Sequence, residues 1–245
     1  IPSIIMAFVV IVCLANNIDS AEWLSAAEKA LLKANLQTDN QGKASRLSEV
    51  FFNPRVWLLV LILLTFNTGF YGLAFWMPSI IKSTGITNSL HIRLLTAIPY
   101  VCGAISMVVI GRLSDATGER RKFVAGLVVV GAVGFFCAGI FADHTTFLIV
   151  ALGLLGSGII ASIPSFWTLP PKLLAGAGAG AAGGIAVINT LGQFGGIVSP
   201  VMVGRIKDLT GSTTPALYVI GVCALIAVAL LLWGLPQKLR TLDKF

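Results

Sequence analysis

The sequence has few charged residues for its length. Of 245 residues, 11% are Asp, Glu, Lys or Arg, whereas 56% are hydrophobic and the mean hydropathy is +0.92. A soluble globular domain carries roughly 25% charged residues, because its surface must be hydrated. This composition therefore argues against a soluble domain and favours a chain embedded in a lipid bilayer.

Paired cysteines and long basic regions are lacking too. The four cysteines stand singly in apolar segments, and none forms a Cys-x-x-Cys pair, so neither a disulfide framework nor a zinc site is indicated. The net charge is +7, but the bases lie in short clusters between apolar runs. That distribution is typical of membrane proteins and not of nucleic-acid-binding proteins. We predict no cofactor, no metal and no nucleic-acid partner.

Six apolar segments are long enough to cross a bilayer, for which a helix needs about 20 residues. They cover residues 55–81, 94–113, 123–142, 146–167, 183–204 and 215–235. We therefore expect an all-α membrane protein with a six-helix transmembrane bundle over residues 55–235.

Three further segments surround the predicted bundle. Residues 1–14 are apolar without the basic start of a signal peptide, so we expect the end of a truncated membrane helix. Residues 15–54 are predicted to form a cytoplasmic connection. Within it, 19–36 reads as an amphipathic helix on the membrane surface, capped by Ser20 or Asp19, and 38–50 as a flexible linker. Residues 236–245 are predicted to form a cytoplasmic tail.

The bases predict how the spans are oriented. If residues 1–14 end in the cytoplasm, thirteen of the seventeen bases fall on the cytoplasmic side: Lys29, Lys33, Lys43, Arg46, Arg55, Arg112, Arg120, Arg121, Lys122, Lys172, Lys238, Arg240 and Lys244. Lys82, Arg93, Arg205 and Lys207 remain outside. This bias follows the positive-inside rule. We expect a multi-pass protein of the inner (plasma) membrane with a cytoplasmic C-terminus.

The most charged run, GRLSDATGERRK at residues 111–122, joins two predicted spans on that cytoplasmic side. We expect Gly111 to allow close approach of helices, and Gly118 to let the chain turn sharply. Asp115 is placed to pair with Arg112 or Arg120, and Arg121 lies beside them. The bases would also hold the loop at the anionic inner leaflet.

This run resembles the G-x-x-x-D-x-x-G-x-R-[RK] loop of the major facilitator superfamily, with matches at Gly111, Asp115, Gly118, Arg120 and Arg121. Longer stretches, such as FWTLPPKLLAGAGAGAAGGIAVINTLGQFGGIVSP, are similar to its anion:cation symporter branch, the permeases for phthalate, tartrate and sugar acids. The resemblance implies the C-terminal half of a twelve-helix fold, with the end of helix six, in which the loop latches a cytoplasmic gate. It also implies symport of a small organic anion with a proton or sodium, and a missing N-terminal six-helix half.

Neutral polar residues inside the spans are the candidate substrate contacts, since no Asp, Glu, Lys or Arg lies in the middle of a predicted span. Amide and hydroxyl groups suit a hydroxylated acid, because they donate and accept hydrogen bonds without burying charge. The candidates, which the resemblance favours over their neighbours, are Asn67, Tyr71, Trp167, Asn189 and Gln193.

Other interpretations stay open at this point. Asn189 and Gln193 could bond across helices, Tyr71 and Trp167 could be packing or interfacial residues, and we expect Trp76 to be an interfacial anchor. A membrane enzyme or a channel would need catalytic clusters or polar rings that the sequence lacks. A non-transporting membrane subunit or a receptor-like protein remains as the alternative to a transporter.

Overall fold

The computed structural model describes residues 2–15, 17–40, 51–174 and 179–235, and within these ranges all regular structure is helical. Six spans there are long and apolar enough, by length and composition, to cross a membrane. They are α4 (Pro54–Lys82), α5 (Ser89–Thr117), α6 (Arg120–Ile140), α7 (Thr145–Phe166) with α8 (Leu169–Leu173), α9 (Ala179–Gly192) with α10 (Gly195–Thr210), and α11 (Thr214–Ala229) with the π-helix η1 (Leu230–Gly234). The predicted all-α class and six-helix bundle are confirmed.

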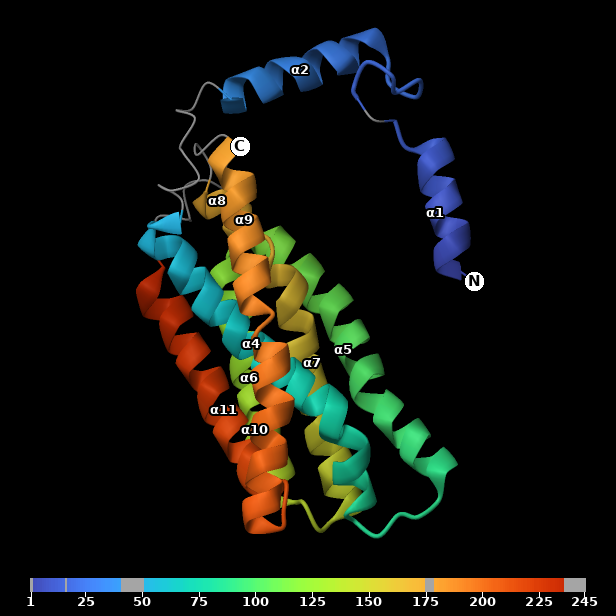
Figure 1. Ribbon diagram of the computed structural model, residues 1–245, viewed down its shortest axis with the longest axis vertical. Coiled ribbons are helices and arrows are strands. Elements are labelled where there is room, and N and C mark those ends of the chain that lie inside the picture. The colour runs from blue at the N-terminus through green and yellow to red at the C-terminus, as the bar shows by residue number, and fades with distance from the viewer. Residues whose placement is uncertain (1, 16, 41–50, 175–178, 236–245) are drawn as a thin grey trace.

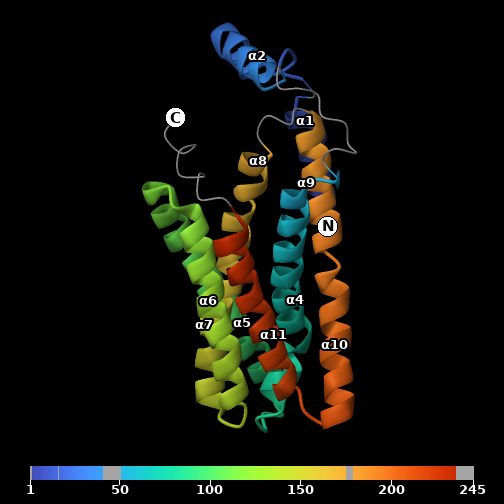
Figure 2. The ribbon, with the colours of Figure 1, turned by 90° about the vertical axis from the view of Figure 1, so that its left-hand side faces the viewer.

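The spans alternate in direction along a common axis (Figure 1). Helix α7 packs between α5 and α6, and α4 packs against α9, α10 and α11, so α4 is central to its side of the bundle. The start of α4, the turn between α5 and α6, and α8 lie at one end of the bundle, which we call the basic end (Figure 2). Its described bases are Arg55, Arg112, Arg120, Arg121, Lys122 and Lys172.

Helix α5 is longer than predicted at both ends. It begins at Ser89 because the Asn88 side chain accepts hydrogen bonds from the backbone N–H groups of Leu90 and His91. It ends where Gly118 takes a left-handed conformation with φ of 69°, which glycine adopts without a Cβ clash. The polar residues at both ends of α5 lie outside the apolar segment 94–113 from which the span was predicted. The sharp turn expected at Gly118 is present.

Two apolar clusters fill the bundle at different heights. The basic-end cluster is built around Leu59, Phe66 and Phe166, and the far-end cluster around Leu73, Met77 and Leu152. Helices within each cluster approach closely: a Cβ added to Gly158 of α7 would lie 2.2 Å from the backbone nitrogen of Gly131 in α6. Small residues permit such contacts between membrane helices. The stretch of α4 between the two clusters contains buried polar residues.

Helices α1 (Pro2–Cys13) and α2 (Ala26–Asn40) stand outside the bundle, with α2 beyond its basic end (Figure 1). The side chains of Ile4, Phe8 and Ile11 in α1 are 63%, 66% and 77% exposed. The apolar surface of α1 is therefore not covered by the described part of the chain.

The predicted cap of the amphipathic helix is wrong. Neither Ser20 nor Asp19 caps α2; Ser25 does, since its hydroxyl accepts from the Glu28 N–H and its own N–H donates to the Glu28 carboxylate at 2.9 Å. This reciprocal pair is a capping box. Asp19 forms an ion pair with Lys33 instead, which lowers the pKa of the Asp19 carboxyl. The expected linker 38–50 lies mostly outside the described residues, and the expected tail 236–245 entirely so.

Candidate functional site

A polar layer lies between the two apolar clusters, where α4 meets α9 and α10. Asn67 and Thr68 of α4 and Ser199 of α10 are buried there, with exposed fractions of 6%, 4% and 0%. The Ser199 hydroxyl donates to the Thr68 carbonyl oxygen at 2.5 Å. This pair could not be predicted from the sequence, because only the fold brings residues 131 positions apart into contact.

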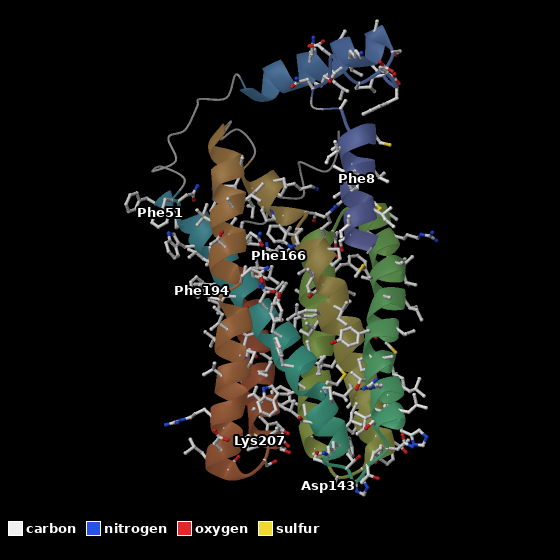
Figure 3. All side chains as sticks on the ribbon, turned by 45° about the vertical axis from the view of Figure 1, so that its right-hand side comes forward. Phe8, Phe51, Asp143, Phe166, Phe194 and Lys207 are labelled. Carbon is white, nitrogen blue, oxygen red and sulfur yellow. The ribbon has the colours of Figure 1, made fainter. Side chains whose placement is uncertain are left out.

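The span formed by α9 and α10 is interrupted in this layer, at Gln193 and Phe194. The Gly196 N–H, which would bond Gly192 in a continuous helix, donates to the Gln193 carbonyl at 2.9 Å. The Gly192 carbonyl instead accepts from Asn67 Nδ2 at 2.9 Å. Figure 3 shows Phe194 at the break, pointing away from the bundle. The single span predicted over 183–204 is present, and the break within it was not predicted.

Glycines let α4 approach this break at backbone distance. A Cβ on Gly195 would lie 2.4 Å from the Leu64 carbonyl oxygen and 2.8 Å from the Thr68 backbone nitrogen. A Cβ on Gly192 would lie 2.6 Å from the Leu63 side chain. The break therefore fits against α4 only when both positions lack a side chain.

Three of the predicted site residues form one chain of hydrogen bonds. The Tyr71 hydroxyl donates to Gln193 Oε1 at 3.4 Å, and Gln193 Nε2 donates to Asn189 Oδ1 at 3.4 Å. Both bonds are long, and Gln193 and Asn189 are exposed whereas Tyr71 is half-buried. The expected bonding across helices is thus present between Tyr71 and Gln193, and these groups stay accessible from the surface of the bundle.

Aromatic rings flank the hydroxyl end of this chain. The Tyr71 ring stacks on Phe75 with centroids 6.3 Å apart, and it meets Phe70 edge-to-face at 5.3 Å. Phe75 is exposed. An amide, a hydroxyl and an aromatic face therefore lie side by side, which suits a small ligand that has both polar groups and an apolar face.

Trp167 lies apart from the hydrogen-bonded chain, at the end of α7. It is half-buried against the basic-end cluster, and its ring meets Phe166 edge-to-face at 5.6 Å. Phe166, labelled inside the bundle in Figure 3, meets Phe66 of α4 at the same centroid distance of 5.6 Å. Trp167 is thus linked to the polar layer through two phenylalanines, since Phe66 precedes Asn67.

The indole of Trp76, for which the sequence predicts an interfacial anchor, also contacts a neighbouring helix. Its Nε1 donates to the Pro200 carbonyl at 3.3 Å, and Lys207 Nζ lies 5.0 Å from the ring centroid. Figure 3 labels Lys207 near the far end of α10. The contact ties α10 to α4 on the far side of the polar layer.

The charged run at 111–122 forms the end of α5, the turn at Gly118 and the start of α6. Arg120 pairs with Asp115 at 2.9 Å, so Arg120 and not Arg112 is the described partner. The Arg121 guanidinium donates to the Leu232 carbonyl in η1, where a base suits the negative end of a helix. The close approach expected at Gly111 is not found within the described residues: a Cβ there would meet no atom within 4 Å.

Within the described residues, no group of three His, Cys, Asp or Glu side chains could hold a metal ion. The layer thus offers neutral hydrogen-bonding groups, together with aromatic rings. Such groups can bind and orient a solute, and they form no constellation for covalent chemistry.

These features define a multi-pass membrane protein with a polar layer at mid-height. Residues 1–200 match the sequence model of the Major Facilitator Superfamily, and the chain belongs to that family.

Three relatives illustrate the similarity. The chain is 34% identical over 242 residues to the "Putative metabolite transport protein NicT" of Pseudomonas putida, covering 98% of this chain and 55% of that protein. It is 33% identical to a quinolone resistance transporter of Acinetobacter baumannii, covering 94% and 53%. It is 37% identical to a "Putative tartrate transporter" of Agrobacterium vitis, covering 89% and 50%. The chain thus spans about half the length of the curated relatives it matches.

Proposed function

We propose that this chain is the C-terminal half of a secondary active transporter that moves a small organic anion, such as a sugar acid or an aromatic or dicarboxylic acid. Transport would occur by symport, with a proton or sodium as the coupling ion. The substrate would bind near the bilayer midplane between two six-helix halves that alternate in access. Membership of a transporter family supports the general role, and the relatives named for a metabolite and for tartrate favour this substrate class.

The hydrogen-bonded chain of Tyr71, Gln193 and Asn189 is the observation that carries the proposal. It lies at mid-height, is accessible and is neutral. We infer that these groups bind the hydroxyl and apolar parts of the substrate, and that Trp167, which lies apart from them at the end of α7, contacts another part of it. Because the predicted spans of this chain have no charge in their middle, the group that pairs with the carboxylate and the group that carries a proton belong to the other half.

The exposed apolar surface of α1 supports the proposal that more of the bundle surrounds it. We propose that α1 is the end of helix six, that helices one to five are encoded upstream of Ile1, and that α2 lies on the cytoplasmic face of the plasma membrane. The bases gathered at the basic end support the proposal that this end, together with the C-terminus, faces the cytoplasm. The loop at 111–122, with Gly111, Arg112, Asp115, Gly118, Arg120 and Arg121, would then form part of the cytoplasmic gate.

Uptake measurements test the function. The whole transporter, made of this chain and the upstream half, is reconstituted in proteoliposomes with an inward proton or sodium gradient and labelled sugar acids, tartrate or an aromatic acid. We expect gradient-driven uptake of at least one of these anions, and none by this chain alone. Absence of uptake for every anion by the whole protein would contradict the substrate class, and uptake by this chain alone would contradict the need for two halves.

The orientation has its own test. A cysteine is introduced at Ser83 or Thr84, in the turn after α4, in a variant without the native cysteines, and intact cells are treated with a membrane-impermeant thiol reagent. We expect labelling at these positions and none at a cysteine introduced at Thr117. The reverse pattern would place the basic end outside.

A further inference from the structure

We propose that Asn67 is a positioning residue that fixes the break between α9 and α10 and thereby presents Gln193 to Tyr71. Its consequence for transport rests on the function proposed above. This role differs from a direct contact with substrate, which is the role that the sequence suggested for Asn67.

The Gly192 carbonyl is the group that Asn67 satisfies at the break. The break deprives this carbonyl of its usual partner, since the Gly196 N–H bonds Gln193 instead. Asn67 Nδ2 supplies the missing donor at 2.9 Å, and Asn67 is buried. A buried carbonyl without a donor is strongly disfavoured, especially in a membrane, where no water replaces the lost bond. Removing the amide therefore favours a different course of the chain at Gly192.

The short side chain of Asn67 also matches the space between α4 and the break. Gly195 brings the break to backbone distance from α4, and a Cβ there would also lie 3.0 Å from Asn67 Cβ. A short side chain with an amide donor fits this space, whereas a longer one would push α10 away. Geometry and chemistry thus both select asparagine at position 67.

Asn67 is linked to the hydrogen-bonded chain of Tyr71, Gln193 and Asn189 through the break. Asn67 and Tyr71 are four residues apart and share one face of α4. Asn67 bonds the last residue of α9, and Tyr71 bonds the next residue, Gln193. Two positions one turn apart on α4 therefore hold two successive residues at the break, and the direction of the Gln193 side chain depends on where Gly192 is held.

A matched control exists in the same interface. Ser199 also makes a buried hydrogen bond between α10 and α4, to the Thr68 carbonyl, but inside a continuous helix. A Ser199→Ala variant loses one buried interhelical bond without touching the break. Any effect specific to the break must appear for Asn67 and not for Ser199.

The geometry of the break is tested on this chain, reconstituted in nanodiscs. Spin labels are attached to cysteines that replace the exposed Ala182 of α9 and Val201 of α10, after the native cysteines have been replaced, and the label–label distance distribution is measured by pulsed EPR. We expect Asn67→Leu to shift or broaden the distribution and Ser199→Ala to leave it unchanged. If Asn67→Leu does not fold, Asn67→Ser, which is smaller and lacks the amide, takes its place. An unchanged distribution for the Asn67 variant, or an equal change for both positions, would overturn the proposal.

Transport by the whole protein tests the consequence. We expect Asn67→Leu to raise KM about tenfold with Vmax within about twofold of the parent, as the loss of a binding interaction does. The double variant with Gln193→Ala should show no higher KM than Gln193→Ala alone, because Asn67 acts through Gln193. KM increases that multiply would mean that Asn67 contacts the substrate directly, which overturns the positioning role. If Gln193→Ala itself leaves KM unchanged, the proposed substrate site fails, while the EPR result still decides the role of Asn67 at the break.

Discussion

The Tyr71 hydroxyl in α4 donates a hydrogen bond to the Gln193 amide oxygen at the break between α9 and α10, over 3.4 Å and 122 positions of sequence. This bond joins two helices at an accessible point between the apolar clusters. The Tyr71 phenol and the Gln193 amide therefore orient each other.

Replacing Tyr71 by Phe removes the hydroxyl and keeps the ring that stacks on Phe75. We expect KM of the whole transporter for its anion to rise about fivefold, because one hydrogen bond contributes roughly 1 kcal/mol. The thermal midpoint of unfolding in detergent should stay within the experimental error. Tyr218→Phe is the control: Tyr218 lies in α11 and its ring stacks on Phe136 of α6, so this change should leave KM unchanged. Equal KM values for Tyr71→Phe and the parent would remove Tyr71 from the site.

Gly195→Ala places a methyl group 2.4 Å from the Leu64 carbonyl oxygen. Since the contact is with the backbone, α10 must move, and we expect the free energy of unfolding to fall by about 2 kcal/mol. The measurement is the unfolding midpoint of this chain in a denaturant or on heating. Gly126→Ala in α6 is the matched control, because a Cβ there meets no atom within 4 Å. It should be neutral or slightly stabilising, as alanine favours a helix. Equal losses for both variants would mean that the space at Gly195 does not matter.

Asp115→Asn removes the ion pair with Arg120. The Asp115 side chain is 66% exposed, so we expect the free energy of unfolding to change by less than about 1 kcal/mol. If the loop latches a gate, the initial rate of uptake should nevertheless fall severalfold. Lys122→Gln, which breaks the adjacent pair with Glu119, serves as the control and should leave the rate near the parent value. Restoration of the rate by exchanging the charges at positions 115 and 120 would support the latch, and an unchanged rate in Asp115→Asn would exclude it.

The segment before α2 should respond to acid. The Lys33 ammonium holds the pKa of the Asp19 carboxyl below its ordinary value of 3.8. A lowered pKa in the folded state means that the pair stabilises this segment above pH 3.8 and that the stabilisation is lost as the pH falls through the lower, folded value. Because both side chains are exposed, a spin label at position 22 should gain only slightly in mobility between pH 5 and strongly acidic pH. An Asp19→Asn variant should show the higher mobility at both, and a label that responds near pH 6 would point to another group.

The number and position of the spans could be predicted from the sequence because a bilayer imposes about 20 apolar residues on each helix. Polar turns fell outside that rule, which is why α5 extends beyond 94–113 to the cap at Asn88 and the turn at Gly118. The cap of α2 was missed because the helix begins later than predicted, at Ala26 and not near residue 20. Ser25 therefore directly precedes the helix, and it is followed three positions later by Glu28.

The site could be predicted in part. The spacing of four residues correctly placed Asn67 with Tyr71, and Asn189 with Gln193, on shared faces. The break at Gln193 and Phe194 could not be read from the glycines, because glycine is common in continuous membrane helices. Whether the helix breaks there depends on the backbone of α4 at Leu64 and on the amide of Asn67, which only the tertiary structure brings to Gly192.

The separation of the basic-end cluster from the far-end cluster has a consequence for how this protein can diversify. Side chains at positions 71, 189 and 193 can be exchanged without disturbing either group of buried apolar residues. Under the proposed function, preference for one solute over another would drift through substitutions at these accessible positions, while the scaffold that folds and inserts remains the same.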